Sequence, residues 1–160
     1  MEGLIQAFVT LFIIMDPVAS VPMFLSLSKG LPLKEIKKNV NDSVFVAAII
    51  LFVFLFFGIA IFTFFGVNLD SFQIAGGIIL LIIGIFYVFG IALKFSKAQS
   101  VNLSVPIGTP LLTGPGVITT TIILVKQYGT STTLVAAVLT LAVTWIVLIS
   151  SGLGLPMLVG

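Results

Sequence analysis

The sequence contains no cysteine, no histidine and very few charged residues. Without cysteine, disulfide bonds and thiolate metal sites are excluded, and without histidine the usual near-neutral proton carrier is missing. Only 8% of the 160 residues are charged, and the net charge of +2 comes from lysines with no arginine. No basic stripe is present to neutralise phosphates, so nucleic acid is not expected as a partner. No phosphate-binding loop motif occurs, so ATP is not expected to drive an activity.

Apolar residues, in contrast, are abundant. They make up 59% of the chain, and its mean hydropathy is +1.35. Average soluble domains are about a quarter charged, and so few charges could not cover a water-exposed surface of this size. The excess apolar surface must therefore face lipid, which makes the bilayer the first expected partner.

Five long apolar blocks divide the chain. They cover residues 3–28, 43–66, 72–93, 104–126 and 132–152. Each is close to the roughly 20 helical residues that cross a hydrocarbon layer of about 30 Å. They are apolar all round and show no amphipathic stripe, which is typical of membrane spans. The predicted fold class is an all-α membrane protein, a polytopic helical bundle.

The lysines indicate an orientation. Segments 29–42 and 94–102 hold six of the seven lysines. If all five blocks cross, both segments lie on one side, and the positive-inside rule makes that side cytoplasmic. This topology predicts a multi-pass cell-membrane protein with its N-terminus outside. A competing topology, in which blocks one and four are re-entrant, would place all seven lysines inside. Segment 29–42 itself is expected to be a basic amphipathic loop or an interfacial helix.

Blocks one and four share an interruption near the middle. Block one reads MDPVASVP over 15–22, and block four reads TGPGVITT over 113–120, so a shift of 98 residues superposes Pro17 on Pro115. Proline removes a backbone donor and disrupts the preceding turn, which frees polar backbone at membrane depth. Paired interruptions in two halves of a chain point to a transport site. The alternative is a pair of ordinary proline kinks.

The spacing of the interruptions also predicts internal symmetry. Three spans separate their starting points, and an odd number of crossings inverts the second repeat relative to the first. We therefore predict inverted three-helix repeats with broken first and fourth helices, over residues 1–98 and 99–160. The second repeat has no counterpart of the third span, so a sixth helix is expected to be missing from this chain.

Asp16 is the leading candidate in the first break. An ionised carboxylate near mid-membrane is costly without a partner, so it could bind the ammonium group of an amino acid, a sodium ion or a proton. Alternatively, Asp16 caps the half-helix that begins at Pro17. Ser20 on that half-helix is a weaker candidate. Asp70, in contrast, is expected to be a solvated cap of the third helix.

The second break offers backbone instead of charge. Gly114 and Gly116 expose peptide groups next to Thr113, and a helix that begins at Pro115 would direct its positive dipole end at a carboxylate. Thr119 and the two threonines after it could line a path, or their hydroxyls could bond back to the preceding turn.

Three segments resemble a known family: FIIMDPVASVPMFLSL over 12–27, FQIAGGIILLIIGI over 72–85, and VPIGTPLLTGPGVITTTIIL over 105–124. Together they resemble the MarC family, also described as the small neutral amino acid transporter family, within the LysE-type transporter superfamily. The resemblance extends over essentially the whole chain. It implies inverted three-helix repeats and transport of amino acids such as glycine and alanine. Two departures stand out: the family has asparagine where this chain has Asp16, and six spans where five occur here.

The function expected from these features is secondary transport, with a small-molecule substrate bound between the two breaks. No cofactor and no enzymatic activity are expected, and sodium or proton coupling is an open possibility. A channel would need a polar stripe along several spans, and a non-transporting membrane scaffold would leave the paired breaks unexplained. Glycines in the third block (Gly76, Gly77, Gly84 and Gly90) let a neighbouring helix approach closely, and they would permit a homo-oligomer.

Overall fold

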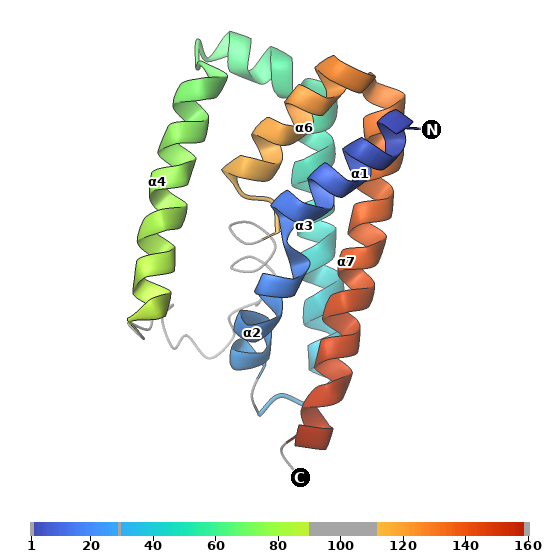
Figure 1. The fold of residues 1–160 in the computed structure, drawn as a ribbon. Coiled ribbons are helices and arrows are strands. Elements are labelled where there is room, and N and C mark those ends of the chain that lie inside the picture. Colours follow the sequence, from blue (N-terminus) through green and yellow to red (C-terminus); the bar gives the residue numbers. More distant parts are fainter. Residues whose placement is uncertain (1, 29, 90–111, 159–160) are drawn as a thin grey trace.

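The computed structural model describes residues 2–28, 30–89 and 112–158, and in these ranges the chain forms helices and no strands (Figure 1). The helices are α1 (Glu2–Met15), α2 (Pro17–Leu27), α3 (Leu33–Phe64), α4 (Leu69–Val88), α6 (Pro115–Tyr128) and α7 (Thr130–Leu158). The predicted all-α class is confirmed. The expected repeat boundary at residues 98 and 99, segment 94–102, Gly90 and the first part of block four lie outside the described residues.

The first apolar block is two helices in line rather than one. α1 ends at Met15 and α2 begins at Pro17, so the predicted interruption occurs at Asp16. Together α1 and α2 run the length of the bundle, from the end that carries the N-terminus to the end where α3 begins (Figure 1).

The second apolar block forms the longest helix. α3 has 32 residues and begins at Leu33, ten residues before the block predicted from hydropathy. Most of segment 29–42 is therefore the first turns of α3, and not a separate loop or interfacial helix. The reason is a continuous buried face: Ile36, Val40, Ser43 and Ala47 follow one another at helical spacing. At 1.5 Å per residue, α3 is about 48 Å long, so its lysine-bearing turns reach beyond a hydrocarbon layer of about 30 Å.

Three segments among the described residues are long and apolar enough to cross a membrane: Glu2–Pro22, Leu33–Phe64 and Thr130–Gly152. α4 adds 20 residues that are mostly apolar and carry one charge, at Asp70. Large apolar side chains also cover the outside of the bundle; Phe45, Phe56 and Phe57 are all more than half exposed. A surface of this kind suits contact with lipid and not with water.

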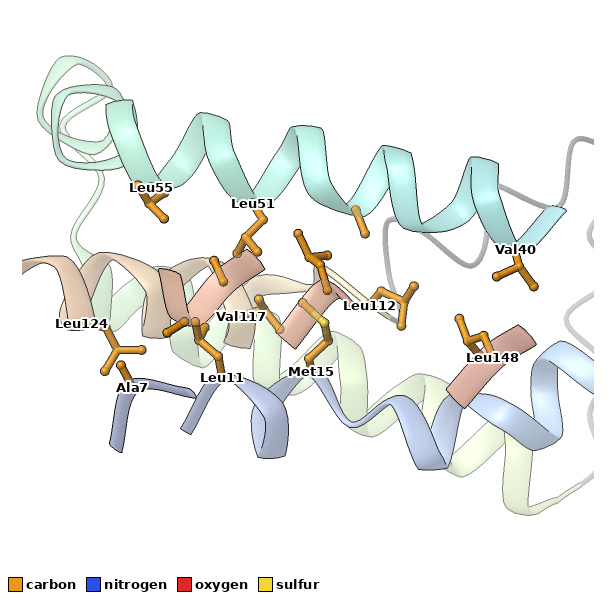
Figure 2. Close-up of a cluster of buried hydrophobic side chains, with 14 of the residues drawn as sticks. Ala7, Leu11, Met15, Val40, Leu51, Leu55, Leu112, Val117, Leu124 and Leu148 are labelled. Atoms are coloured by element: carbon orange, nitrogen blue, oxygen red, sulfur yellow. The ribbon is translucent and has the colours of Figure 1, made fainter. Parts of the chain in front are cut away.

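The core lies where α1, α3, α6 and α7 meet (Figure 2). α1 contributes Ala7, Leu11 and Met15, one turn apart, and all three are essentially inaccessible. They pack in one cluster with Leu112, in the turn before α6, and with residues of the other three helices: Val40, Ala47, Leu51, Leu55, Val117, Leu124, Ala136, Ala137, Leu141 and Leu148. Helix association in lipid depends on close packing, and alanines at these positions let the backbones approach.

α4 stands to one side of this core and meets it through α6 (Figure 1). Gly76 of α4 is buried against Pro115, and a Cβ added at Gly76 would overlap the proline ring. Gly77, one residue further on, has nothing within 4 Å of the corresponding position. The packing role expected for the third-block glycines is thus confirmed at Gly76. A second small cluster, built on Phe62, Ile118 and Ile122, joins the ends of α3 and α4 to α6.

Candidate functional site at the two helix breaks

Asp16 makes the first break by leaving the helical conformation. Its φ of 41° and ψ of 65° are left-handed, and it is the one non-glycine residue with positive φ in the part of the chain that the structure describes. Aspartate tolerates this conformation because its short carboxylate can hydrogen-bond locally. Here Oδ1 accepts the backbone N–H of Ala19 at 3.1 Å. The expected capping role is present, and the side chain is nevertheless exposed on the bundle surface.

The backbone around Asp16 is partly satisfied by its own neighbours. Its N–H donates to the carbonyl of Phe12 at 3.0 Å, and its carbonyl accepts both the N–H and the hydroxyl of Ser20. Pro17 is buried and has no N–H, so the carbonyl of Ile13 lacks the donor that a continuous helix would supply. Ser20 is only 3% exposed, and its hydroxyl proton is used in the bond to Asp16.

The second break is built without a side-chain cap. Gly114 occupies the N-cap position of α6 in an extended conformation (φ −75°, ψ 179°), and Pro115 is the first helical residue. Because Gly114 has no side-chain acceptor, the N–H groups of Gly116 and Val117 have neither an intrahelical partner nor a side-chain cap among the described residues. Gly114 is buried, and Pro115 and Gly116 are partly buried. In the part of the chain that the structure describes, this break therefore places uncapped amide donors inside the protein.

Threonines anchor the second break and its helix. Thr113 is 2% exposed, and its hydroxyl donates to the carbonyl of Ala47 on α3 at 3.1 Å. Thr119 is fully buried, and its hydroxyl donates to the carbonyls of Pro115 and Gly116 within α6. Thr121 bonds to Val117 in the same way. The hydroxyls of Thr119 and Thr121 thus bond back to the preceding turn, as in one of the two expected alternatives.

The two breaks lie against each other, although 98 residues separate them. Met15, next to Asp16, packs in one buried cluster with Leu112 and Val117, which flank the second break (Figure 2). A Cβ added at Gly116 would lie 3.5 Å from a methyl carbon of Ile14. The structure therefore brings together the two groups of candidate residues, Asp16, Pro17 and Ser20 on one side and Thr113, Gly114, Pro115, Gly116 and Thr119 on the other.

Thr144 of α7 also belongs to this region and was not expected from the sequence. Its hydroxyl lies 3.3 Å from the sulfur of Met15, and the residue is fully buried. Thr133, Thr140 and Thr144 are all buried on α7. Their helical spacing in an otherwise apolar block was the signal that could have identified them.

The directions of the half-helices determine the electrostatics of the breaks. α2 and α6 both begin in the middle of the bundle and run toward opposite ends (Figure 1). The N-termini of both helices, which carry partial positive charge, therefore lie in the middle, together with the negative C-terminal end of α1. Such an arrangement can hold an anionic group at the α6 amides and a cationic group at Asp16, whose carboxylate already caps the start of α2. Among the described residues, no cluster of three or more Asp, Glu, Cys or His side chains could hold a metal ion.

Asp70 has a different role from the one expected. It lies in the first turn of α4, and its N–H donates to the side-chain oxygen of Asn68 at 3.0 Å. Asn68 is thus the residue that caps this helix end. The exposed carboxylate of Asp70 lies near the positive end of the helix dipole, where a negative charge is favourable.

Comparison with known proteins agrees with an integral membrane protein. Residues 1–158 match the family described as MarC family integral membrane protein. This chain belongs to the MarC family. The residues that carried the resemblance, on both sides of each break, lie within the matched range.

Several relatives of this MarC family protein are known from bacteria and archaea. A UPF0056 membrane protein of Methanocaldococcus jannaschii is 32% identical over 94% of this chain and 80% of its own length. The UPF0056 inner membrane protein YhgN of Escherichia coli K12 is 32% identical over 99% of this chain and 83% of its own length. A UPF0056 membrane protein of Archaeoglobus fulgidus is 35% identical over 77% of this chain and 62% of its own length. No solved structure matches the chain.

Proposed function

We propose that this MarC family protein is a secondary transporter of small neutral amino acids of the glycine and alanine type. Its substrate would bind between the Asp16–Pro17 and Gly114–Pro115 breaks. The observation that carries the proposal is the meeting of two proline-initiated helix breaks inside a membrane protein. Irregular backbone at membrane depth is tolerated where it is buried in protein or lines a solute path.

The electrostatics of the breaks favour a zwitterion. The uncapped amides at the start of α6 suit a carboxylate, and the exposed carboxylate of Asp16 suits an ammonium group. A small amino acid carries both groups on one carbon. The nearby residues Ile14, Met15 and Val117 are apolar, so a substrate with a short apolar side chain fits here better than one with a charged side chain.

The opposed directions of α2 and α6 support inverted repeats. The first break opens a half-helix toward one end of the bundle, and the second opens one toward the other end (Figure 1). In inverted-repeat transporters this symmetry lets one repeat rock against the other around a fixed site. On this proposal, the repeats cover 1–98 and 99–160, and a further helix would complete the second.

The energy source in this proposal is an ion gradient, with Asp16 as the site of sodium or proton coupling. No cofactor and no catalytic reaction form part of it. The membrane would be the cell membrane, the inner membrane in the case of the relative YhgN. The lysine-rich segments would face the cytoplasm and the N-terminus the outside.

The test is uptake of radiolabelled glycine and alanine by the protein reconstituted in proteoliposomes, under imposed sodium or proton gradients. Wild type should show saturable, gradient-dependent uptake. Asp16→Asn removes the charge but keeps a residue that tolerates the left-handed conformation and caps equally well. We expect uptake to fall by at least tenfold, because a hydrogen bond to a charged group contributes about 1.5–3 kcal/mol.

Asp70→Asn is the matched control, since it makes the same chemical change at an exposed helix end away from the breaks. Its uptake should equal that of wild type. Circular dichroism should show equal helix content in all three proteins. Wild-type protein that is folded and transports neither amino acid would refute the proposed substrate, and full activity in Asp16→Asn would exclude a charge-dependent role for Asp16.

A further inference from the structure

A cavity of about 420 Å³ lies away from the breaks, where α3, α4 and α6 approach one another. It opens between the last turns of α3, the turn that leads into α4, and the end of α6. Its lining consists of Ile59, Phe62, Thr63, Gly66, Val67, Asn68, Leu69 and Lys126. These elements lie at the end of the bundle that also carries the N-terminus (Figure 1). The volume falls within the range of ligand-binding pockets, roughly 300–1,000 Å³.

Two side chains of this cavity, those of Asn68 and Lys126, present donors, whereas the hydroxyl proton of Thr63 is already used within α3. The Thr63 hydroxyl donates to the carbonyl of Ile59 at 2.8 Å, and the Asn68 side-chain oxygen accepts the N–H of Asp70 at 3.0 Å. The Asn68 amide therefore presents its NH₂ group as a donor. Lys126, in the last turn of α6, adds a positive charge and is exposed. No carboxylate is among the lining residues, so the polar side of the cavity suits an anion.

The remaining walls are apolar and lie at the edge of the membrane. Ile59, Phe62, Val67 and Leu69 line the cavity. α3 ends at Phe64 and α4 begins at Leu69, so we expect the turn between these two apolar helices to lie at an edge of the hydrocarbon layer. Phe64 and Phe65 beside it are 85% and 70% exposed, which suits contact with lipid. A ligand that fills this cavity must therefore be amphiphilic.

We propose that this cavity binds an anionic phospholipid from the leaflet on the N-terminal side. Its phosphate lies between the Lys126 ammonium and the Asn68 amide, and the first part of an acyl chain packs against Phe62, Val67 and Leu69. Lysine is a common phosphate ligand. A free phosphate ion would use the polar groups alone and would gain nothing from the four apolar walls, which is why the lipid is the favoured source of the phosphate.

The test compares lipid retention by native mass spectrometry of the whole protein released from mixed micelles. Phosphatidylglycerol is offered against phosphatidylcholine at equal concentration. Wild type should retain phosphatidylglycerol preferentially. Lys126→Gln should reduce that preference about fivefold, the effect expected of one lysine near an anionic lipid. Lys34→Gln, an exposed lysine at the start of α3 and the opposite end of the bundle, is the matched control and should leave it unchanged.

A second variant distinguishes lipid binding in the cavity from attraction of the lipid by the charge of Lys126 alone. Val67→Trp fills the cavity and leaves Lys126 in place, so it should reduce retention as much as Lys126→Gln. Equal retention in Val67→Trp and wild type, with helix content preserved by circular dichroism, would overturn the proposed cavity. Displacement of the lipid by inorganic phosphate at millimolar concentration would identify a free-anion site and overturn the lipid assignment.

Discussion

The two helix breaks use the same proline device and satisfy the freed backbone in different ways. At the first, Asp16 adopts a left-handed conformation and caps Ala19 with its own carboxylate, on the surface of the bundle. At the second, Gly114 is extended, has no cap and is buried. The first break therefore supplies charge and the second supplies free amides. On the proposed function, these two kinds of group are complementary parts of one binding site.

The largest effect on stability is expected when the side-chain cap at Asp16 is removed. Asp16→Ala loses the capping carboxylate and places an alanine in the left-handed region, which together should destabilise the protein by about 2 kcal/mol. Asp16→Asn should stay close to wild type, because asparagine keeps the cap and tolerates the conformation. Thermal unfolding in detergent measures both. Equal stability of the alanine and asparagine variants would show that the conformation of Asp16 does not depend on its side chain.

A slightly smaller effect is expected where α4 supports the second break. Gly76→Ala places a methyl group into the ring of Pro115 and should destabilise the protein by about 1–3 kcal/mol. Gly77→Ala is the matched control: its new methyl group meets open space, and alanine is the better helix former by up to about 1 kcal/mol. Thermal unfolding of both should give opposite signs. A Gly76→Ala protein as stable as Gly77→Ala would contradict the close contact between α4 and α6.

The smallest effect is expected on substrate affinity, when the second break is given a side-chain cap. Gly114→Ser gives the second break a side-chain acceptor like the one at the first, which would compete with a substrate carboxylate for the free amides. We expect the half-saturating concentration for glycine uptake to rise about tenfold, the loss of roughly one charge-assisted hydrogen bond. Gly114→Ala adds the same Cβ without an acceptor, so it should raise the half-saturating glycine concentration less. Equal values for the serine and alanine variants would argue that the amides do not bind substrate.

The features predicted correctly from sequence depend on local chemistry. The apolar blocks identified a membrane protein because lipid is the only solvent that tolerates so much apolar surface. The break at Asp16 was predicted from Pro17, because proline has no backbone N–H and cannot make the helical hydrogen bond at any interior position. Two predictions were wrong, and both concern the start of a helix. α3 begins at Leu33 because its buried face continues through the lysine-rich turns, and α4 is capped by Asn68 and not by Asp70.

The sequence by itself therefore determined the solvent, the break at Asp16 and the start of a helix at Pro115, since composition and proline act within a few residues. Only the tertiary structure decided which groups those breaks meet. Thr113 donates a hydrogen bond to Ala47, Met15 lies against Thr144, and Gly76 packs against the ring of Pro115. Each pair joins residues that are far apart in the sequence, so it depends on how the helices and the turn before α6 pack in three dimensions. No periodicity within a single helix encodes that packing, because in lipid several apolar faces of a helix are equally suited to contact a neighbour.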